Sequence, residues 1–233
     1  MSEIIYKGYK RSGLQKTGRR TAPSKGKKLY VNPNDFKSAA DVDYPLKRGF
    51  DLIVASFLSV ILGLVYPFIA AGIRLSSNGP VITKSPCTGK HGHIFFCYEF
   101  RTTHTHKFEA YSRRAKNDFS QEKETFAFGR FLRKSNLDKL PQIINVMRGE
   151  MSIVGPKPLT VKDCEKRCRK FDDHFYRYLV KPGMTGLAQV NKSNSEVGIK
   201  GIMRNQLDSD LLYVKENSLI FDLKVIEIGR AHV

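Results

Sequence analysis

The chain has 233 residues, enough for one domain of ordinary size with extensions. Hydrophobic residues make up 41% of it and charged residues 27%, a balance that excludes a chain disordered throughout. The formal net charge of +18, from 40 Lys and Arg against 22 Asp and Glu, predicts an anionic partner: a nucleic acid, an acidic membrane surface or a phosphorylated substrate.

Residues 1–44 are predicted to form a basic, disordered tail. Residues 1–48 hold 12 Lys or Arg against 4 Asp or Glu and show no apolar period. Such a tail could bind nucleic acid or lie on anionic lipid. The apolar segment that follows it favours lipid, and no standard nucleic-acid-binding motif is present, so we expect no nucleic-acid partner.

Residues 52–73 form an apolar segment of 22 residues without a charge. As a straight helix it would be about 33 Å long, enough to cross a bilayer core. Lys47 and Arg48 precede it and Arg74 follows it, and positive charge tends to stay on the cytoplasmic side. Pro67 lies inside the segment and favours a kink. We therefore predict a re-entrant helix over a true crossing, and either over the buried helix of a soluble core.

Residues 80–103 are predicted to form short strands. PVITK and HIFFCYEFRT are rich in strand-forming residues and flank a turn near Gly89 to Gly92. Two cysteines and two histidines surround this turn, but their spacing is not that of a standard zinc site. The four side chains are Cys87, His91, His93 and Cys97. We favour a simple hairpin turn here over a metal site.

The rest of the chain is predicted to be mainly helical. Breaks are expected at GEMSIVGPKPL and in a loop at VKPGMTGLAQV. Cys164 and Cys168 stand at an i, i+4 spacing that would place them on one helix face. No secretory signal is present, so free thiols are expected. The predicted helices cover residues 108–135, 140–148, 160–178 and 205–227.

The last residues, EIGRAHV, fit nothing before them, and IGRAHV matches one reading frame of a common sequencing adapter. We therefore predict a folded domain over residues 45–227, including the apolar segment, and a non-native tail over residues 228–233.

Asp138, in SNLDKLPQI (135–143), is the residue closest to catalytic chemistry, because it stands just before a predicted helix. A carboxylate there can simply favour the helix dipole. An ionised carboxylate is also a known covalent nucleophile for phosphoryl groups. The residues around Asp138 leave both interpretations open.

Seven motifs in order resemble the bacterial sugar transferases, the small monotopic phosphoglycosyl transferases that start glycan assembly on polyprenol phosphate. The likeness covers roughly Leu46 to Lys224, and the motifs are KRGFD, the Pro-broken apolar segment, GPVI, FRT, GRFLRKSNLDKLPQIINVMRGEMSIVGPKPL, VKPGMTGLAQVN and DLLYVKENSLIFDLK. Each motif alone is weak, whereas the ordered set is highly specific.

The resemblance implies a fold and a reaction. The fold would be α/β, mostly helical with a small β element, and embedded by one re-entrant N-terminal helix in the cytoplasmic face of the bacterial inner membrane. Asp138 would attack the phosphate of a nucleotide-diphosphate sugar, a UDP-sugar in most of the family, and release the nucleoside monophosphate. Polyprenol phosphate would then take the sugar phosphate from the enzyme, which initiates capsule, exopolysaccharide or O-antigen synthesis. The family uses Mg²⁺, but the sequence does not identify the residues that would bind it.

Diphosphate chemistry also needs positive charge at the reacting phosphates. Four cations are available, one of them in a rigid proline turn that would hold it with little backbone freedom. The predicted phosphate-binding residues are Arg133, Lys134, Pro156, Lys157, Pro158 and Lys181.

The sequence departs from the family at several of these positions. Lys139 stands where the family has Glu beside the nucleophile, and it cannot ligate Mg²⁺ as a carboxylate does. Two hypotheses follow: an active, divergent transferase in which Lys139 supplies charge to the phosphates, or a catalytically impaired relative that acts as a membrane-bound binding or scaffold protein. The other departures are Lys157 and Lys181 in place of Arg, Asn191-Lys192-Ser193 in place of Asn-Gly-Arg, and Glu99 in place of Lys.

Overall fold

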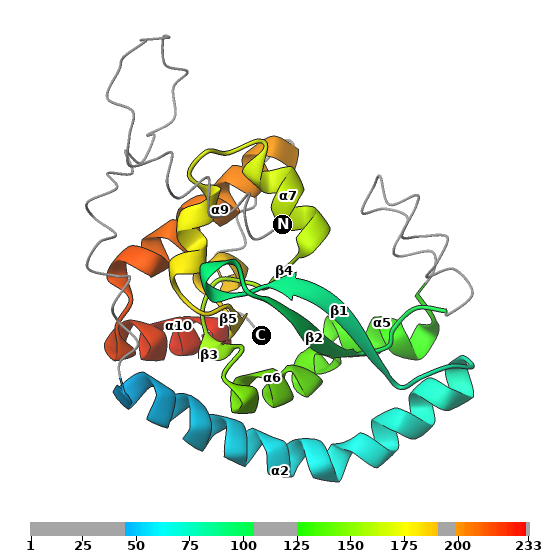
Figure 1. The fold of residues 1–233 in the computed structure, drawn as a ribbon. Helices are drawn as coiled ribbons and strands as arrows, with labels where there is room; N and C mark the ends of the chain where they lie inside the picture. Colours follow the sequence, from blue (N-terminus) through cyan, green and yellow to red (C-terminus); the bar gives the residue numbers. More distant parts are fainter. Residues whose placement is uncertain (1–44, 105–124, 191–198, 232–233) are drawn as a thin grey trace, which may run out of the picture. The chain divides into compact units, whose positions relative to one another are not determined.

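The computed structural model describes residues 45–104, 125–190 and 199–231. It is mostly helical with two small sheets, as predicted (Figure 1). The predicted tail and most of the predicted 108–135 helix lie outside the described residues. The elements are α2 Pro45–Ser76, β1 Ile82–Thr88, η2 Lys90–Gly92, β2 Ile94–Phe100, α5 Ala127–Lys134, η4 Leu137–Gln142, α6 Ile143–Arg148, β3 Ser152–Val154, β4 Leu159–Thr160, α7 Val161–Cys168, η5 His174–Leu179, β5 Gly183–Thr185, α8 Leu187–Val190, α9 Ile199–Glu216 and α10 Leu219–Ala231.

The strands form two sheets. β1 and β2 make the predicted hairpin, and β4 pairs antiparallel with the end of β1, where Cys87 faces Thr160. The hairpin turns at η2, where Gly92 has a φ of 80°, a value that favours glycine. In the second sheet β3 pairs parallel with β5, with Val154 opposite Thr185.

The predicted helix over residues 160–178 is wrong. α7 ends at Cys168, and a separate 3₁₀ helix, η5, covers His174–Leu179. Tyr176, Tyr178 and Leu179 of η5 are all buried. The pattern of charges predicted an exposed helix and did not reveal this buried segment.

Two further predictions need correction toward the C-terminus. The predicted loop over residues 180–190 contains β5 and α8. The predicted helix over residues 205–227 is two helices, and Ser218 Oγ, which accepts from Phe221 N at 3.2 Å, caps the start of the second. α10 runs on to Ala231, so the backbone stays helical into the predicted tail.

The described chain divides into two compact units. Unit 2 comprises Phe50–Pro86 and Phe96–Gly149. Its core forms where one side of α2 meets the strands and α5. The buried members are Ile69, Ile73, Val81, Phe100, Phe126 and Leu132.

The other side of α2 is apolar and exposed. Ile53 and Phe68 expose 73% and 77% of their surface, and Phe57, Val60 and Leu64 are also exposed. α2 continues through Pro67 as one curved helix (Figure 1). Among the described residues it is the one helix long and apolar enough to cross a membrane. An exposed apolar surface of this kind typically marks a site of interaction with a membrane or another protein.

Arg101 holds the C-terminal end of α2. Its guanidinium donates from Nη2 to Ser77 O at 2.5 Å, from Nη1 to Ser77 Oγ at 2.8 Å and from Nε to Pro80 O at 2.7 Å. Only 3% of Arg101 is exposed, and burial lowers its pKa. Arg101, in the motif FRT, is therefore a structural anchor that satisfies the carbonyls after the helix.

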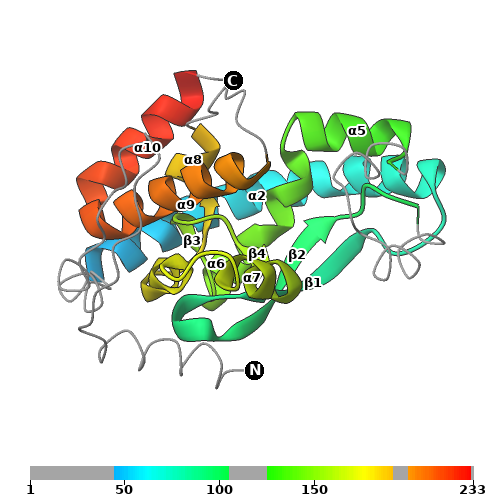
Figure 2. The same ribbon diagram turned by 90° about the horizontal axis from the view of Figure 1, so that it is seen from above.

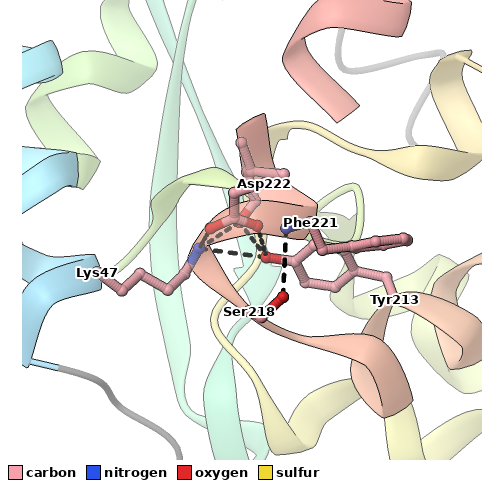
Figure 3. Close-up of polar contacts among 6 residues, drawn as sticks. Lys47, Tyr213, Ser218, Phe221 and Asp222 are labelled. Carbon is pink, nitrogen blue, oxygen red and sulfur yellow. Dashed lines mark hydrogen bonds and ion pairs between the residues drawn. The ribbon is translucent and has the colours of Figure 1, made fainter. Parts of the chain in front are cut away.

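Unit 1 comprises the described parts of Met1–Gly49, Cys87–Phe95 and Glu150–Val233, and it is organised around Lys47. Lys47 Nζ forms an ion pair with Asp222 Oδ2 and donates to Tyr213 Oη at 3.2 Å and to Val154 O at 3.3 Å (Figure 3). Tyr213 Oη lies 2.7 Å from Asp222 Oδ1. This Lys47 node joins the start of α2, β3, α9 and α10. In the same unit α8 packs beside α9 (Figure 2).

We predict that Lys47→Met destabilises the protein by about 3–5 kcal/mol, because the fully buried Asp222 carboxylate would lose its counter-ion. Thermal unfolding in detergent measures the loss. Lys224→Met, the same change at an exposed position on α10, should alter stability by no more than about 0.5 kcal/mol. Equal effects of the two substitutions would show that the Lys47 node is not a stabilising contact.

Candidate active site

Asp138 lies in the first turn of η4, which continues into α6. The sequence predicted a position just before a helix; Asp138 lies instead inside a 3₁₀ turn that opens at Asn136. Asn136 has a φ of 56°, in the left-handed region that Asn tolerates better than most residues. The Asp138 side chain is half-buried, and its Oδ1 atom is shielded from solvent. The turn thus presents a carboxylate at the surface of unit 2 on a defined backbone.

Two buried amides fix this turn on the edge of β2. Asn145 donates from Nδ2 to Phe96 O at 2.7 Å, and its Oδ1 accepts from Tyr98 N at 3.2 Å. The Asn145 amide thereby makes the hydrogen bonds to the β2 backbone that a neighbouring strand would otherwise make. Gln142 Nε2 donates to Glu99 Oε1 at 3.0 Å, which gives Glu99, unusual for the family, a structural partner. These amides were not predicted; their one signal was polar residues interrupting an apolar helix pattern.

The cations near Asp138 in the sequence lie on α5 and η4. Arg133 Nε donates to Thr102 Oγ1 at 2.8 Å, which attaches its guanidinium to the motif FRT. Lys134 is exposed, and Lys139 Nζ donates to Asn136 Oδ1 at 3.0 Å. Unit 2 therefore carries Asp138 together with three cationic residues. Arg133 and Lys134, the predicted phosphate-binding residues, lie on α5, and Lys139, which replaces the family's Glu, lies on η4.

The two proline loops of unit 1 are held together by their backbones. Gly183 N donates to Pro156 O at 3.0 Å, and Gly155 N donates to Thr185 O at 2.9 Å. A Cβ added to Gly183 would collide with the backbone of Gly155, so the approach requires glycine. The loops are Gly155–Pro158, which carries the exposed Lys157, and Lys181–Gly183, which carries the half-buried Lys181.

Arg177 supports the first of these loops from inside unit 1. Its Nη2 donates to Lys157 O at 2.7 Å and pairs with Asp210 Oδ2 at 2.9 Å. Burial raises the pKa of Asp210, although the Arg177 charge opposes the rise. Arg177 was not predicted, because its partners are distant in sequence and nothing local marks it.

The predicted site residues therefore fall into two groups, one in each unit. Arg133, Lys134, Asp138 and Lys139 belong to unit 2, and the residues of the two proline loops belong to unit 1. Among the described residues, one group of His, Cys, Asp or Glu side chains is close enough together to bind a metal ion. Asp138 is not part of that group. Mg²⁺ prefers oxygen ligands, and beside the Asp138 carboxylate the side chain of Lys139 offers none. Asp138 and Lys139 therefore do not by themselves form a Mg²⁺ site.

Residues 42–229 match the family described as "Bacterial sugar transferase", and the chain belongs to this family of phosphoglycosyl transferases. It is 34% identical over 181 residues to the UDP-glucose:undecaprenyl-phosphate glucose-1-phosphate transferase of Escherichia coli, a match that covers 78% of the chain and 38% of that relative.

The chain is also similar to two other relatives. The undecaprenyl-phosphate galactose phosphotransferase of Salmonella typhimurium is 34% identical, over 64% of the chain and 33% of that relative. The uncharacterized sugar transferase EpsL of Bacillus subtilis is 36% identical, over 78% of the chain and 83% of that relative. The chain thus spans well under half the length of the E. coli and Salmonella relatives.

We predict that Gly183→Ala destabilises unit 1 by about 3 kcal/mol or more, because the added methyl group would collide with backbone atoms that cannot swing aside. Gly63→Ala on α2 is the matched control, since nothing lies within 4 Å of its added Cβ. That control should be neutral or slightly stabilising. Thermal unfolding of both variants decides; a stable, wild-type-like Gly183→Ala protein would contradict the close approach of the loops.

Proposed function

We propose that the chain transfers a sugar 1-phosphate from a nucleotide-diphosphate sugar, most simply a UDP-sugar, to polyprenol phosphate, and so initiates cell-surface glycan synthesis. The family match over residues 42–229 supports the reaction class, and the E. coli and Salmonella relatives carry names of this reaction with undecaprenyl phosphate as acceptor. The observation that carries the proposal is a carboxylate in the first turn of η4, followed and preceded by cationic residues.

In the proposed reaction an Asp138 carboxylate oxygen attacks the phosphorus that bears the sugar. The bond from that phosphorus to the bridging oxygen breaks, and the bridging oxygen leaves on the nucleoside monophosphate. A phosphate oxygen of the lipid then attacks the same phosphorus, and the Asp138 carboxylate leaves. No group is oxidised or reduced, and the carboxylate is regenerated.

Cationic side chains would stabilise the charge that develops on the transferred phosphate. In unit 2 we assign this role to Arg133 and Lys134, together with Lys139, whose ammonium Asn136 holds near the start of η4. In unit 1 we assign phosphate binding to Lys157 and Lys181, on loops that the glycine contact makes rigid. Mg²⁺ is implied by family membership alone, and no step of the proposed reaction depends on it.

Lys139 also favours a second candidate function, in which the protein binds lipid or partners without turnover. A lysine beside the nucleophile would attract the carboxylate electrostatically and weaken it, instead of assisting it. The two functions differ in whether the wild-type protein retains a sugar phosphate.

We predict that purified wild-type protein retains radiolabelled sugar phosphate from a nucleotide sugar, and that Asp138→Asn reduces labelling on the order of 10³-fold or more. Asp163→Asn is the matched control, because Asp163 is also a first-turn carboxylate, on α7, but has no assigned role in the reaction. If Lys139 stabilises the charge on the phosphate, the Lys139→Glu variant should retain less label than the wild type. Labelling by Lys139→Glu but not by wild type, across several nucleotide sugars, would favour the second candidate.

We further propose that α2 enters the cytoplasmic leaflet of the inner membrane and that both its ends stay on the cytoplasmic face. The start of α2 is bonded within unit 1 through Lys47 and Asp222, and its end within unit 2 through Ser77 and Arg101. The chain passes between the units within β1 and β2. These strands contain no second membrane-length segment that could return the chain across a bilayer. The basic tail and flanks would add attraction to anionic lipid.

We predict that Leu46→Cys and Leu75→Cys, exposed positions near the two ends of α2, both react with a membrane-impermeant maleimide only from the cytoplasmic side. Inverted and right-side-out vesicles distinguish the sides. Phe57→Cys, on the exposed apolar side of α2, should react only after detergent is added. Labelling of the two end positions from opposite sides would establish a true crossing.

A further inference from the structure

Three side chains of metal-binding type meet inside unit 1, and none of them is assigned to the reaction. Cys164 and Cys168 lie one turn apart on α7, and His174 begins η5. Their ligand atoms all lie within 4.8 Å of one another. Cys164 and His174 expose 2% and 1% of their surface, and Cys168 is half-buried.

The spacing of these atoms fits the ligand sphere of Zn²⁺. Zinc binds sulfur at about 2.3 Å and nitrogen at about 2.0–2.1 Å, so tetrahedral geometry separates two sulfurs by about 3.8 Å and a sulfur from a nitrogen by about 3.6 Å. Cys164 Sγ lies 3.9 Å from Cys168 Sγ, and Cys168 Sγ lies 3.4 Å from His174 Nδ1. The remaining pair, Cys164 and His174, lies within 4.8 Å, so side-chain movement could bring all three atoms to one ion.

The charges around the group also favour Zn²⁺ over a harder cation. Arg167 and Arg177 lie close enough to act electrostatically on His174, so an uncompensated cation would be repelled. Two cysteine thiolates neutralise a divalent ion, and the resulting complex carries no net charge. Thiolate and imidazole ligands select zinc, whereas Mg²⁺ requires oxygen ligands.

Tyr178 lies beside this group. Its Oη atom is buried and close enough to Cys164 to share a hydrogen bond with the sulfur, and it has no nitrogen or oxygen partner among the described residues. Most structural zinc sites have four protein ligands, so a site made of these three side chains would need a water in the fourth position. A water bound there could form a hydrogen bond with Tyr178.

We propose that Cys164, Cys168 and His174 bind a structural Zn²⁺ that fixes α7 to η5. This segment connects the two proline loops, since α7 follows Lys157 and η5 precedes Lys181 in the chain. The ion would therefore stabilise the base from which both loops extend. The simpler alternative is a thiol–imidazole hydrogen-bonded group without metal, with all four cysteines as free thiols.

The first test is the zinc content of the purified full chain, measured by plasma mass spectrometry. About one zinc per chain is expected in the wild type, and a large loss in Cys164→Ser, Cys168→Ser and His174→Gln. Cys87→Ser is the matched control, because Cys87 is another buried cysteine of unit 1 and lies outside the group. Loss of zinc from Cys87→Ser as large as from the three variants would overturn the assignment.

The second test uses only the wild-type chain, so it does not depend on the folding of a variant. Protein stripped with a chelator and supplied with Co²⁺ should develop a thiolate-to-cobalt charge-transfer band, which Zn²⁺ then abolishes and Mg²⁺ does not. The thermal midpoint should fall on stripping and recover with Zn²⁺. A wild type that purifies without zinc and gives no cobalt band would overturn the proposal, and neither result depends on transferase activity.

Discussion

The buried contact between Lys47 and Asp222 is the interaction on which most of unit 1 depends. Its partners are far apart in the chain: Asp222 is 175 residues from Lys47, and Tyr213 is 166. The contact therefore joins the beginning of the apolar helix to the last two helices of the described chain. Val154 O belongs to the same group and ends β3, the strand that leads into the Pro156–Pro158 turn. A charged pair fits at this position because the ammonium donates to three oxygens, those of Asp222, Tyr213 and Val154.

The sequence allowed prediction of elements defined by composition over many residues. The apolar helix, the β1–β2 hairpin and the helix ending at Arg148 follow from hydrophobic runs and turn residues, and the structure confirms them. The segment from 155 to 190 could not be predicted in the same way. Its glycines were interpreted as breakers, whereas Gly155 and Gly183 permit two backbones to touch where β3 pairs with β5. The long-range partners of Lys47 and Arg177 leave no local pattern.

The roles of Asp138 and the cations stay predictions, made from the order of the motifs. The backbone on which these residues stand could not be predicted from the sequence. The left-handed Asn136 opens the η4 turn, and Asn145 attaches the following helix to β2. Lys139 donates to Asn136, so the residue that departs from the family also contacts the residue that opens the turn carrying Asp138. An acid at this position would carry the opposite charge and could not donate that hydrogen bond.

The proposed reaction requires that Asp138 form a covalent bond to the transferred phosphate. Borohydride reduces an acyl phosphate to an alcohol and would convert that aspartate to homoserine, which peptide mass spectrometry locates. We expect homoserine at position 138 in wild-type protein incubated with its nucleotide sugar, and none without it. Reduction at a different carboxylate, or product formation with position 138 never modified, would contradict the proposed reaction.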